Sequence, residues 1–503
     1  MKVLIVGDGG REHALAVMIS ESTADPSIYV AAGHRNPGLL KLAEDSGGKL
    51  YVANVLDPES VLEVAEEVVP DLVVIGPEEP QFHGVVDVLK EKGFTVFGAT
   101  SRLAKIEMSK AFARELMWKY KIPGRLPYRA FASIDEALKY MEMAGDVVIK
   151  PARQAGGKGV KVLADTQAYL MDDRARVKKD YVKKLFQDIA SKYRDIDVKV
   201  LIEQRVEGVE YTVMVITDGS TVLPLPAVQD HPHAFELDLG PETGGMGSIA
   251  GPGVVPPFLT HEEYYRSVEV VRRSIEALQK EVGEEYRGAI SGQMMLTAVW
   301  GPTIIEFYSR FGDPEISNLV PIIESDFLDI LDRAATGRLA GAKLSIREDL
   351  ATVVKAVAPM GYPGNKSIAK GHPVEVDEGV LRRSDCRLLY AAVELREDGR
   401  MYTTGSRAFE VVCAASTLED ASLRAEEVVS TIKCVDGWPL IHRADIGSSE
   451  LLKERVELAE RIRAVYRYRA EKGVLGTSIV WVPGKGIFFD PLQNPVKVRR
   501  RFV

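Results

Sequence analysis

At 503 residues the chain is too long for one ordinary domain, and three or four domains are expected. With 46% hydrophobic and 27% charged residues, it has the composition of a soluble globular protein with well-filled cores. The net charge of −9 and the pI of about 5.6 argue against a surface that binds nucleic acid. No apolar run has the length of a membrane helix, so no membrane association is expected.

The cysteines and the N-terminus both bear on the cellular compartment of the protein. Cys386, Cys413 and Cys434 are scattered, odd in number and without metal-ligand spacing. We therefore predict that they are small apolar packing residues in a reducing compartment. The first apolar strand begins directly at the N-terminus and leaves no room for a signal peptide, so a cytoplasmic location is expected.

The first hundred residues alternate between short apolar runs and helical patterns. Strands are predicted at 3–6, 28–32, 72–75 and 95–97, and helices at 12–20, 58–68 and 85–92. This βαβ order predicts a parallel sheet that is covered by helices on both faces.

The rest of the chain predicts further domains of mixed structure. Residues 101–327 should contain helices at 101–120, 165–196 and 261–280, strands at 146–150, 198–203 and 211–217, and a long polar loop at 229–257. A hairpin of strands 292–299 and 302–307 should turn at Trp300-Gly301. A compact α+β domain is expected at 328–450, then an extension, 451–503, with a helix at 451–472 and a strand at 478–482. The expected fold class is thus α/β and α+β multidomain.

Two glycine-rich segments are candidate phosphate sites. Residues 7–13 lie between a strand and a helix, where backbone N–H groups and Arg11 suit an anion, although a tight turn of small residues explains them equally well. Glu12 replaces the third glycine of a dinucleotide fingerprint, which disfavours a dinucleotide-dependent oxidoreductase. The second segment, 154–159, follows Lys150 and carries Lys158, but it is not a Walker loop, and a plain glycine hairpin is its alternative.

The segment 305–315 carries the strongest chemical signal. Glu306 suits a divalent cation beside nucleotide phosphates, and Arg310 suits developing negative charge. Gln293 should face Glu306 across the hairpin, so that the two residues together offer two oxygen ligands for magnesium. A metal carboxylate, a phosphate-binding loop and an arginine together predict an enzyme that transfers a phosphoryl group from a nucleotide.

Three weaker signals lie between these segments. Glu203 and Glu210, seven residues apart, suit a ribose and a purine edge, although solvated glutamates would look the same. The glycine density at 240–247 suggests close approach to a ligand. His231 and His233 resemble half of a metal site without a third ligand, so we interpret them as substrate-side or merely polar residues.

Taken in order, these motifs resemble the phosphoribosylamine–glycine ligase (glycinamide ribonucleotide synthetase) family of the ATP-grasp superfamily. The matching segments are residues 7–15, 76–78, 109–112, 155–160, 229–231, 240–247, 310–315, 361–363 and 443–447. The resemblance implies an N-terminal substrate-binding domain at 1–100, an ATP-grasp domain at 101–327 with a mobile lid at 123–197, and a C-terminal α+β domain.

The resemblance also implies a role for each matching residue. Phosphoribosylamine would be bound by Gly9, Gly10, Arg11, Asp230, Gly244, Gly245 and Met246. ATP would be bound by Lys110, Lys150, Gly156, Gly157, Lys158, Glu203, Val206 and Glu210. Gln293 and Glu306 would hold Mg²⁺ or Mn²⁺, and Arg310, Asp313 and Lys158 would be catalytic.

The implied reaction joins glycine to 5-phosphoribosylamine through a glycyl phosphate in purine biosynthesis, in a monomer or small homo-oligomer. Tyr308 stands where the family usually has a metal-ligand asparagine, Gly33-His34 stands for its usual Gly-Asn, and residues 451–503 extend past its usual end. Two alternatives remain: another ATP-grasp carboxylate–amine ligase, or a nucleotide-binding relative that Tyr308 has made inactive.

Overall fold

The computed structural model of the chain describes residues 1–144, 147–153, 161–162, 199–476, 478–482, 485–489 and 499–500, with the single residues 184, 187 and 191. The chain divides into two compact units. Unit 1 comprises Met1–Ala104, Glu210–Gln293 and Phe307–Val456, and unit 2 comprises Lys105–Val209, Met294–Glu306 and Glu457–Val503. Each unit is assembled from three separate stretches, so position along the chain does not define them.

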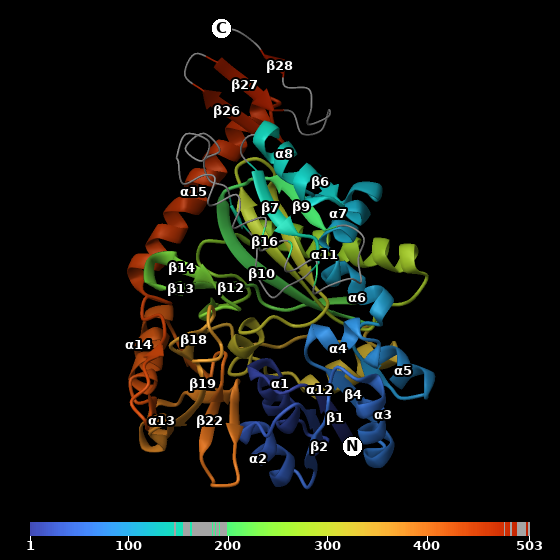
Figure 1. Ribbon diagram of the computed structural model, residues 1–503, viewed down its shortest axis with the longest axis vertical. Coiled ribbons are helices and arrows are strands. Elements are labelled where there is room, and N and C mark those ends of the chain that lie inside the picture. Colours follow the sequence, from blue (N-terminus) through green and yellow to red (C-terminus); the bar gives the residue numbers. More distant parts are fainter. Residues whose placement is uncertain are drawn as a thin grey trace. The chain divides into compact units, whose positions relative to one another are not determined.

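A parallel sheet opens unit 1 (Figure 1, blue). Its order is β3-β2-β1-β4-β5, with β1 Lys2–Val6, β2 Ser27–Ala32, β3 Lys49–Val52, β4 Leu72–Ile75 and β5 Val96–Phe97. The helices of this region are α1 Gly10–Ser20, α2 Pro37–Asp45, α3 Pro58–Val68, α4 Glu78–Phe82 and α5 Val85–Glu91. The predicted parallel βαβ sheet is confirmed.

Side chains of β1 alternate between two cores. Val3 and Ile5 pack in the core that includes residues of α1 and α2, whereas Leu4 and Val6 pack with α3 and α5. This is the period of two expected for a strand that is buried on both faces.

Three elements of this domain were not predicted: α2, β3 and the short helix α4. Helix α2 begins at Pro37, and the Asn36 side chain caps it by accepting from the N–H groups of Gly38 and Leu39. The Asn-Pro pair is a recognisable helix start, since asparagine caps a helix and proline suits its first turn. Strand β3 is short and only partly buried, so its sequence has no apolar run long enough to predict a strand.

Unit 2 contains an antiparallel sheet of order β6-β9-β7-β8. Its strands are β6 Tyr128–Phe131, β7 Val147–Pro151, β8 Lys161–Val162 and β9 Val200–Gln204, and α7 Lys110–Lys119 and α8 Ile134–Ala144 accompany them. Val147, Ile149, Val200 and Ile202 form a core with residues of α8. The glycine loop at 154–160 and most of the helices predicted at 165–196 lie outside the described residues.

A second sheet runs β17-β16-β10-β12-β15-β18-β23-β20, with β11 beside β10 and β25 beside β18. Its strands are β10 Gly208–Thr217, β11 Val222–Pro224, β12 Val228–Asp230, β15 Gly247–Ala250, β16 Gly288–Thr297, β17 Gly301–Tyr308, β18 Ala351–Pro359, β20 Arg387–Tyr390, β23 Phe409–Ala415 and β25 Leu440–Ile441. The chain passes between the two units within β10, β16 and β17.

The prediction of one long polar loop at 229–257 is wrong. This segment contains part of β12, β13 His233–Phe235, the 3₁₀ turn η1 Glu236–Asp238, β14 Leu239–Glu242 and β15. β15 pairs with β18, which lies about a hundred residues further on, so its stability comes from a distant partner. Such short strands, rich in glycine, give no local periodicity.

The predicted helix and hairpin that follow are confirmed as α11 His261–Val282, β16 and β17. The turn differs slightly, because it spans residues 298–300 and Gly301 already begins β17. The turn η2 Glu315–Leu319 and helices α6 Ser101–Met108 and α12 Phe327–Thr336 complete this part of the chain.

The C-terminal α+β domain predicted after residue 328 is confirmed in character. A small sheet of order β21-β22-β19-β24 contains β19 Lys370–Glu375, β21 Val393–Leu395, β22 Met401–Thr404 and β24 Lys433–Cys434. Helices α13 Glu378–Ser384 and α14 Leu418–Val429 cover it through a shared apolar core.

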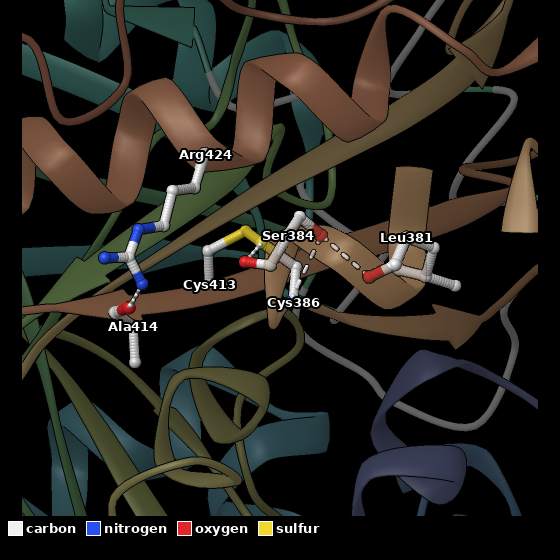
Figure 2. Close-up of a disulfide and its surroundings, with 6 residues drawn as sticks. All are labelled: Leu381, Ser384, Cys386, Cys413, Ala414 and Arg424. Carbon is white, nitrogen blue, oxygen red and sulfur yellow. Dashed lines mark hydrogen bonds between the residues drawn. A yellow bond between two sulfur atoms is a disulfide. The ribbon is translucent and has the colours of Figure 1, made fainter. Parts of the chain in front are cut away.

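A disulfide joins two of the three cysteines (Figure 2). Cys386 immediately precedes β20 and Cys413 lies on β23, with 4.5 Å between their Cα atoms. The prediction that all three cysteines are small apolar packing residues is therefore wrong for these two, while Cys434 is free and buried. The pairing depends on the register of β20 against β23, which cysteine spacing does not reveal.

The extension forms helix α15 Ser449–Glu471 and a sheet of β26 Ser478–Val482, β27 Lys485–Phe489 and β28 Arg499–Arg500. The predicted helix at 451–472 and strand at 478–482 are confirmed. None of the helices in the described part of the chain is both long and apolar enough to cross a membrane.

Candidate active site

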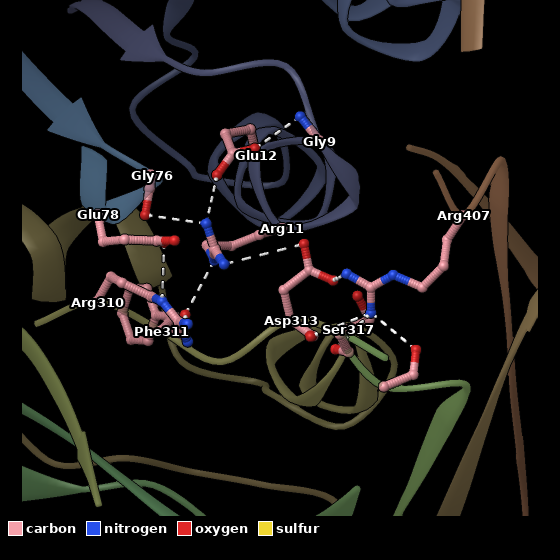
Figure 3. A network of polar contacts seen from close by, with 12 residues as sticks. Gly9, Arg11, Glu12, Gly76, Glu78, Arg310, Phe311, Asp313, Ser317 and Arg407 are labelled. Atoms are coloured by element: carbon pink, nitrogen blue, oxygen red, sulfur yellow. Dashed lines mark hydrogen bonds and ion pairs between the residues drawn. The ribbon is translucent and has the colours of Figure 1, made fainter. Parts of the chain in front are cut away.

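Arg11, in the first turn of α1, has its guanidinium group held by several acceptors (Figure 3). Its Nε donates to the Phe311 carbonyl at 2.9 Å, its Nη1 donates to Glu12 Oε1 at 3.2 Å, and its Nη2 lies 3.9 Å from Asp313 Oδ2. Gly9 is the N-cap residue of α1, and its N–H donates to Glu12 Oε2 at 2.6 Å. Burial raises the pKa of Glu12 to about 7, although Arg11 opposes this shift.

Arg310 follows the end of β17, and its side chain contacts an acid and an aromatic ring. Its Nε donates to Glu78 Oε2 at 3.3 Å, and its guanidinium lies 4.2 Å from the centre of the Tyr308 ring. Burial would raise the pKa of Glu78, but Arg310 and Arg11 outweigh burial and lower it. This stacking and pairing fix the orientation of Arg310.

Tyr308 is connected to Gln293 rather than left as an open ligand position. Its hydroxyl donates to Gln293 Oε1 at 2.5 Å, and Gln293 Nε2 donates to Glu210 Oε2 at 3.1 Å. The oxygen of Gln293 that was predicted to bind a metal therefore accepts from a phenol in this structure.

Asp313 connects three segments that are far apart in the sequence. Arg407 binds its Oδ1 at 2.5 Å through Nη2, and Arg407 Nη1 donates to the carbonyls of Gly244 and Gly245, each at 2.9 Å. Burial would raise the pKa of Asp313, but Arg407 and Arg11 lower it to about 2. Asp313 is therefore a carboxylate, held between two guanidinium groups.

The glycine-rich segment before β15 is held by its backbone. The Gly244 N–H donates to the hydroxyl of Tyr362 at 3.0 Å. A Cβ on Gly245 would lie 3.4 Å from Asp230 Oδ2, and its φ of 106° favours glycine. Met246, in contrast, is fully buried in a hydrophobic core, so its side chain does not reach a substrate in this structure.

Asp230 lies in an acidic neighbourhood. Burial, with Glu315 and Glu210 nearby, raises its pKa well above the ordinary value. Thr212 donates to Glu315 Oε1 at 2.9 Å and fixes that carboxyl group. The neutral form of Asp230 is therefore favoured by burial and by two neighbouring acids.

Unit 2 holds a separate cluster of buried charges. Glu203, on β9, pairs with Arg114 Nε, and its Oε2 lies 3.0 Å from Lys150 Nζ. Burial would raise the pKa of Glu203, but Arg114 and Lys150 lower it to about 2. Glu306 Oε1 lies 3.6 Å from Lys110 Nζ and 3.9 Å from Lys150 Nζ.

Glu203 neutralises two buried cations in this cluster. Its carboxylate is the counter-ion of Arg114 and Lys150, and Arg114 Nη2 also donates to the Ile305 carbonyl at 2.6 Å. Burial lowers the pKa of Lys110, and Glu306 opposes that shift. Two lysines and one carboxylate thus converge from α7, β7 and β17.

His231, which was interpreted together with His233 as a substrate-side or merely polar residue, is buried. Burial lowers the pKa of His231 to about 3, and Arg443 adds to this effect, so His231 is neutral. Nowhere in the described part of the chain do three or more His, Cys, Asp or Glu side chains gather as metal ligands.

The structure therefore groups the predicted residues into two sets, one in each unit. Gly9, Gly10, Arg11, Asp230, Gly244, Gly245, Arg310 and Asp313 belong to unit 1, whereas Lys110, Lys150, Glu203, Val206 and Glu306 belong to unit 2. Gly156, Gly157 and Lys158 lie outside the described residues. Arg114 and Arg407 were not predicted, because a single arginine outside the glycine-rich segments gives no signal in the sequence.

The strand order, the buried lysines around a carboxylate and the parallel N-terminal sheet define a protein of the ATP-grasp class. Three domain profiles match: the phosphoribosylglycinamide synthetase N domain at 1–107, its ATP-grasp (A) domain at 108–316 and its C domain at 352–449. The chain belongs to the phosphoribosylglycinamide synthetase family, and the resemblance seen in the sequence is confirmed.

Similar proteins agree with this assignment. Phosphoribosylamine–glycine ligase of Methanopyrus kandleri is 45% identical over 92% of this chain and 99% of its own length. The Methanocaldococcus jannaschii ligase is 40% identical over 92% of this chain and 100% of its own. The crystal structure of the Thermotoga maritima ligase, 25% identical, superposes with a TM-score of 0.68 over 89% of this chain and 100% of that one. A biotin carboxylase from Campylobacter jejuni, 12% identical, has a TM-score of 0.66 over 92% of this chain and 98% of that one, and shares the fold alone.

Proposed function

We propose that the protein is an ATP-dependent ligase that joins glycine to 5-phosphoribosylamine and releases glycinamide ribonucleotide, ADP and phosphate in purine biosynthesis. Relatives that carry this activity in their names align with nearly their whole length. The observation that carries the proposal is the convergence of Lys110 and Lys150 on Glu306, because two buried cations and a carboxylate suit nucleotide phosphates and their metal.

The chemistry proceeds in two transfers. The glycine carboxylate attacks the γ-phosphorus of ATP, which forms glycyl phosphate and releases ADP. The amine of phosphoribosylamine then attacks the glycyl carbonyl carbon, loses a proton and displaces inorganic phosphate. Neither transfer needs a protein nucleophile, so the residues act by positioning and by stabilising negative charge.

In unit 2, Lys110 and Lys150 would bind ATP phosphates. Glu203 holds Lys150 in place. The family resemblance assigns Val206 to the adenine and Glu210 to the ribose. The loop residues Gly156, Gly157 and Lys158 would cover the phosphates and exclude water, which protects the acyl phosphate from hydrolysis.

Mg²⁺, or Mn²⁺, fits the residues present. Glu306 offers a hard oxygen ligand, and its 3.6 Å and 3.9 Å separations from Lys110 and Lys150 are too long for strong hydrogen bonds. Once nucleotide phosphates neutralise the lysines, Glu306 is available to hold the ion, which would neutralise charge on the transferred phosphoryl group. Gln293 would add a second oxygen ligand, and the hydrogen bond that its oxygen accepts from Tyr308 would compete with the ion for this oxygen.

In unit 1, Arg310 and Asp313 would organise the acyl phosphate. Arg11 and the backbone of Gly9, Gly10, Gly244 and Gly245 would hold phosphoribosylamine, with Asp230 and the backbone of Met246 beside it. The guanidinium groups of Arg11, Arg310 and Arg407 make this region suitable for anionic substrates. We further propose a cytoplasmic monomer or small homo-oligomer that binds neither nucleic acid nor membrane.

ADP release from purified protein tests the proposal. The assay contains MgATP, glycine and freshly generated phosphoribosylamine, and each component is omitted in turn. ADP that appears only with all three components supports the ligase. ADP release that does not depend on glycine indicates another carboxylate–amine ligase, and ATP binding without turnover indicates an inactive relative.

A further inference from the structure

Arg114 is a buried arginine on α7 to which the proposed function gives no role. It is 2% exposed and lies one helical turn after Lys110, so both side chains leave the same face of the helix. This face packs on the sheet of unit 2, because Ala111 shares a small apolar core with Ala152, after β7, and Leu201 on β9. The Lys110 N–H also donates to the Ala152 carbonyl at 2.8 Å. Arg114 is therefore directed at the strands that carry the proposed ATP residues.

The guanidinium group of Arg114 joins two of these strands. Its Nε donates to Glu203 Oε1 on β9, and its Nη2 donates to the Ile305 carbonyl on β17 at 2.6 Å. Ile305 immediately precedes Glu306, the proposed metal ligand. A guanidinium group presents its donors in a rigid planar fork, so one side chain can hold both acceptors at fixed positions. Arg114 thus fixes Glu203, and the strand that carries Glu306, relative to α7.

The carboxylate of Glu203 is shared between two buried cations. Its Oε2 lies 3.0 Å from Lys150 Nζ, while Arg114 binds its other oxygen. With a single cation beside it, a buried carboxylate would hold that cation strongly as its sole counter-ion. Because Arg114 supplies a second cation, the pair of cations carries more positive charge than Glu203 can neutralise.

The same surplus holds for the whole buried charge cluster, which we define as five side chains with three positive and two negative charges: Lys110, Arg114, Lys150, Glu203 and Glu306. A net positive charge in a poorly solvated cluster attracts phosphate groups more strongly than it would in water. Without Arg114 the charges of the other four side chains cancel.

We propose that Arg114 is a positioning residue that neutralises Glu203 and thereby leaves Lys150 available for an ATP phosphate. Its bond to the Ile305 carbonyl also keeps α7 against β17, where Lys110 lies 3.6 Å from Glu306. This inference rests on the proposed ATP-dependent function and assigns Arg114 no contact with ATP itself. Loss of the arginine should therefore affect the binding of phosphates and not the binding of the nucleoside.

Two binding constants test this role without any turnover. Arg114→Met removes the guanidinium group and keeps a long side chain, so Lys150 becomes the sole counter-ion of Glu203. We expect the affinity for MgATP to fall by about tenfold or more and that for adenosine to change by less than about twofold. Both are measured by competition with a fluorescent ATP analogue. An equal loss for both ligands would indicate a merely structural role and overturn the proposal, as would no loss for either.

A charge-balanced double variant separates the lost charge from the lost packing. Arg114→Met combined with Glu203→Gln removes one positive and one negative charge, so the net charge of the buried charge cluster is that of wild type. The ratio of the MgATP and adenosine affinities should return to within about threefold of wild type. This variant leaves no buried charge unpaired and remains informative if Arg114→Met alone does not fold. A ratio as low as that of Arg114→Met would contradict the proposal.

Arg129→Met is the matched control in the same sheet. The Arg129 guanidinium lies 4.9 Å from the centre of the Tyr140 ring, which belongs to the apolar core beneath α8. Its removal should leave the affinity ratio unchanged, and a fall as large as that in Arg114→Met would overturn the proposal. The expected ratios without glycine-dependent ADP release would uphold the role of Arg114 and contradict the ligase. A wild-type protein that does not bind MgATP would contradict both.

Discussion

Glu12 is a buried carboxyl group whose ionisation makes stability depend on pH. Its pKa rises from an ordinary 4.5 to about 7 in the fold, so between these values the folded chain keeps a proton that the unfolded chain has lost. Stability from this residue is therefore complete below pH 4.5 and falls as the pH rises towards 7. The loss is about 3 kcal/mol at pH 8.

Glu12→Gln, which stays neutral, isolates this effect. We expect thermal unfolding between pH 5 and 8 to show that the variant gains stability relative to wild type as the pH rises. The buried histidines His13 and His231 are common to both proteins, and their contributions cancel in the comparison. A difference between the two proteins that does not change with pH would contradict the raised pKa.

Arg310 is the guanidinium group that we expect to matter most for turnover. Its ion pair with Glu78 and its contact with the Tyr308 ring hold it in one orientation. Arg310→Ala should lower kcat by about a hundredfold or more, because a preorganised cation at the developing charge is lost. The exposed Arg382→Ala is the control, and both variants should keep their thermal midpoints to within a few degrees. Near wild-type kcat in Arg310→Ala would remove this residue from the mechanism.

Tyr308 is expected to influence the metal requirement through Gln293. In Tyr308→Phe the ring beneath Arg310 remains, but Gln293 Oε1 loses its donor and becomes free to bind a cation. The Mg²⁺ concentration for half-maximal ADP release should fall by about fivefold, the equivalent of one hydrogen bond. Tyr265→Phe, on the surface of α11, should leave it unchanged. An unchanged requirement in both variants would show that Gln293 is not a metal ligand.

At the scale of elements, the disulfide joins β20 and β23 within the C-terminal domain. It closes a loop of 27 residues, for which the chain-entropy estimate of stabilisation is about 3.5 kcal/mol. Cys386→Ser should lower the thermal midpoint, and a reductant should lower that of wild type equally. Cys434→Ser removes only the free thiol, so a reductant should lower its thermal midpoint by the same amount as that of wild type. Three titratable thiols in unreduced, denatured wild type would contradict the bond.

The elements that sequence analysis predicted are those with strong local signals. β4 and α3 were predicted with the bounds that the structure gives, because one is a buried apolar run and the other has an Asp-Pro start and an apolar stripe. β12 and β15 were missed, because three or four residues with glycine nearby become strands only by pairing with β10 and β18.

At the scale of the whole molecule, the two compact units should unfold separately. The extension from Glu457 onwards belongs to unit 2, where the Gly476 N–H donates to the Val299 carbonyl at 3.1 Å beside Trp300. Calorimetry should show two transitions for wild type. A chain that ends at Val456 should lower one midpoint and leave the other unchanged. A single transition in both proteins, or a shift of both midpoints, would contradict this division.

The sequence by itself determined the parallel N-terminal sheet and the ATP-grasp family, and it predicts site residues whose motifs are contiguous, such as Arg310 and Asp313 within 310–315. Only the tertiary structure decided that Arg407 pairs with Asp313, that Glu203 neutralises Arg114 and Lys150, and that Tyr308 binds Gln293. The physical reason is that backbone periodicity and capping act over a few residues, whereas a buried charge takes its partner and its pKa from whichever strand the fold places beside it.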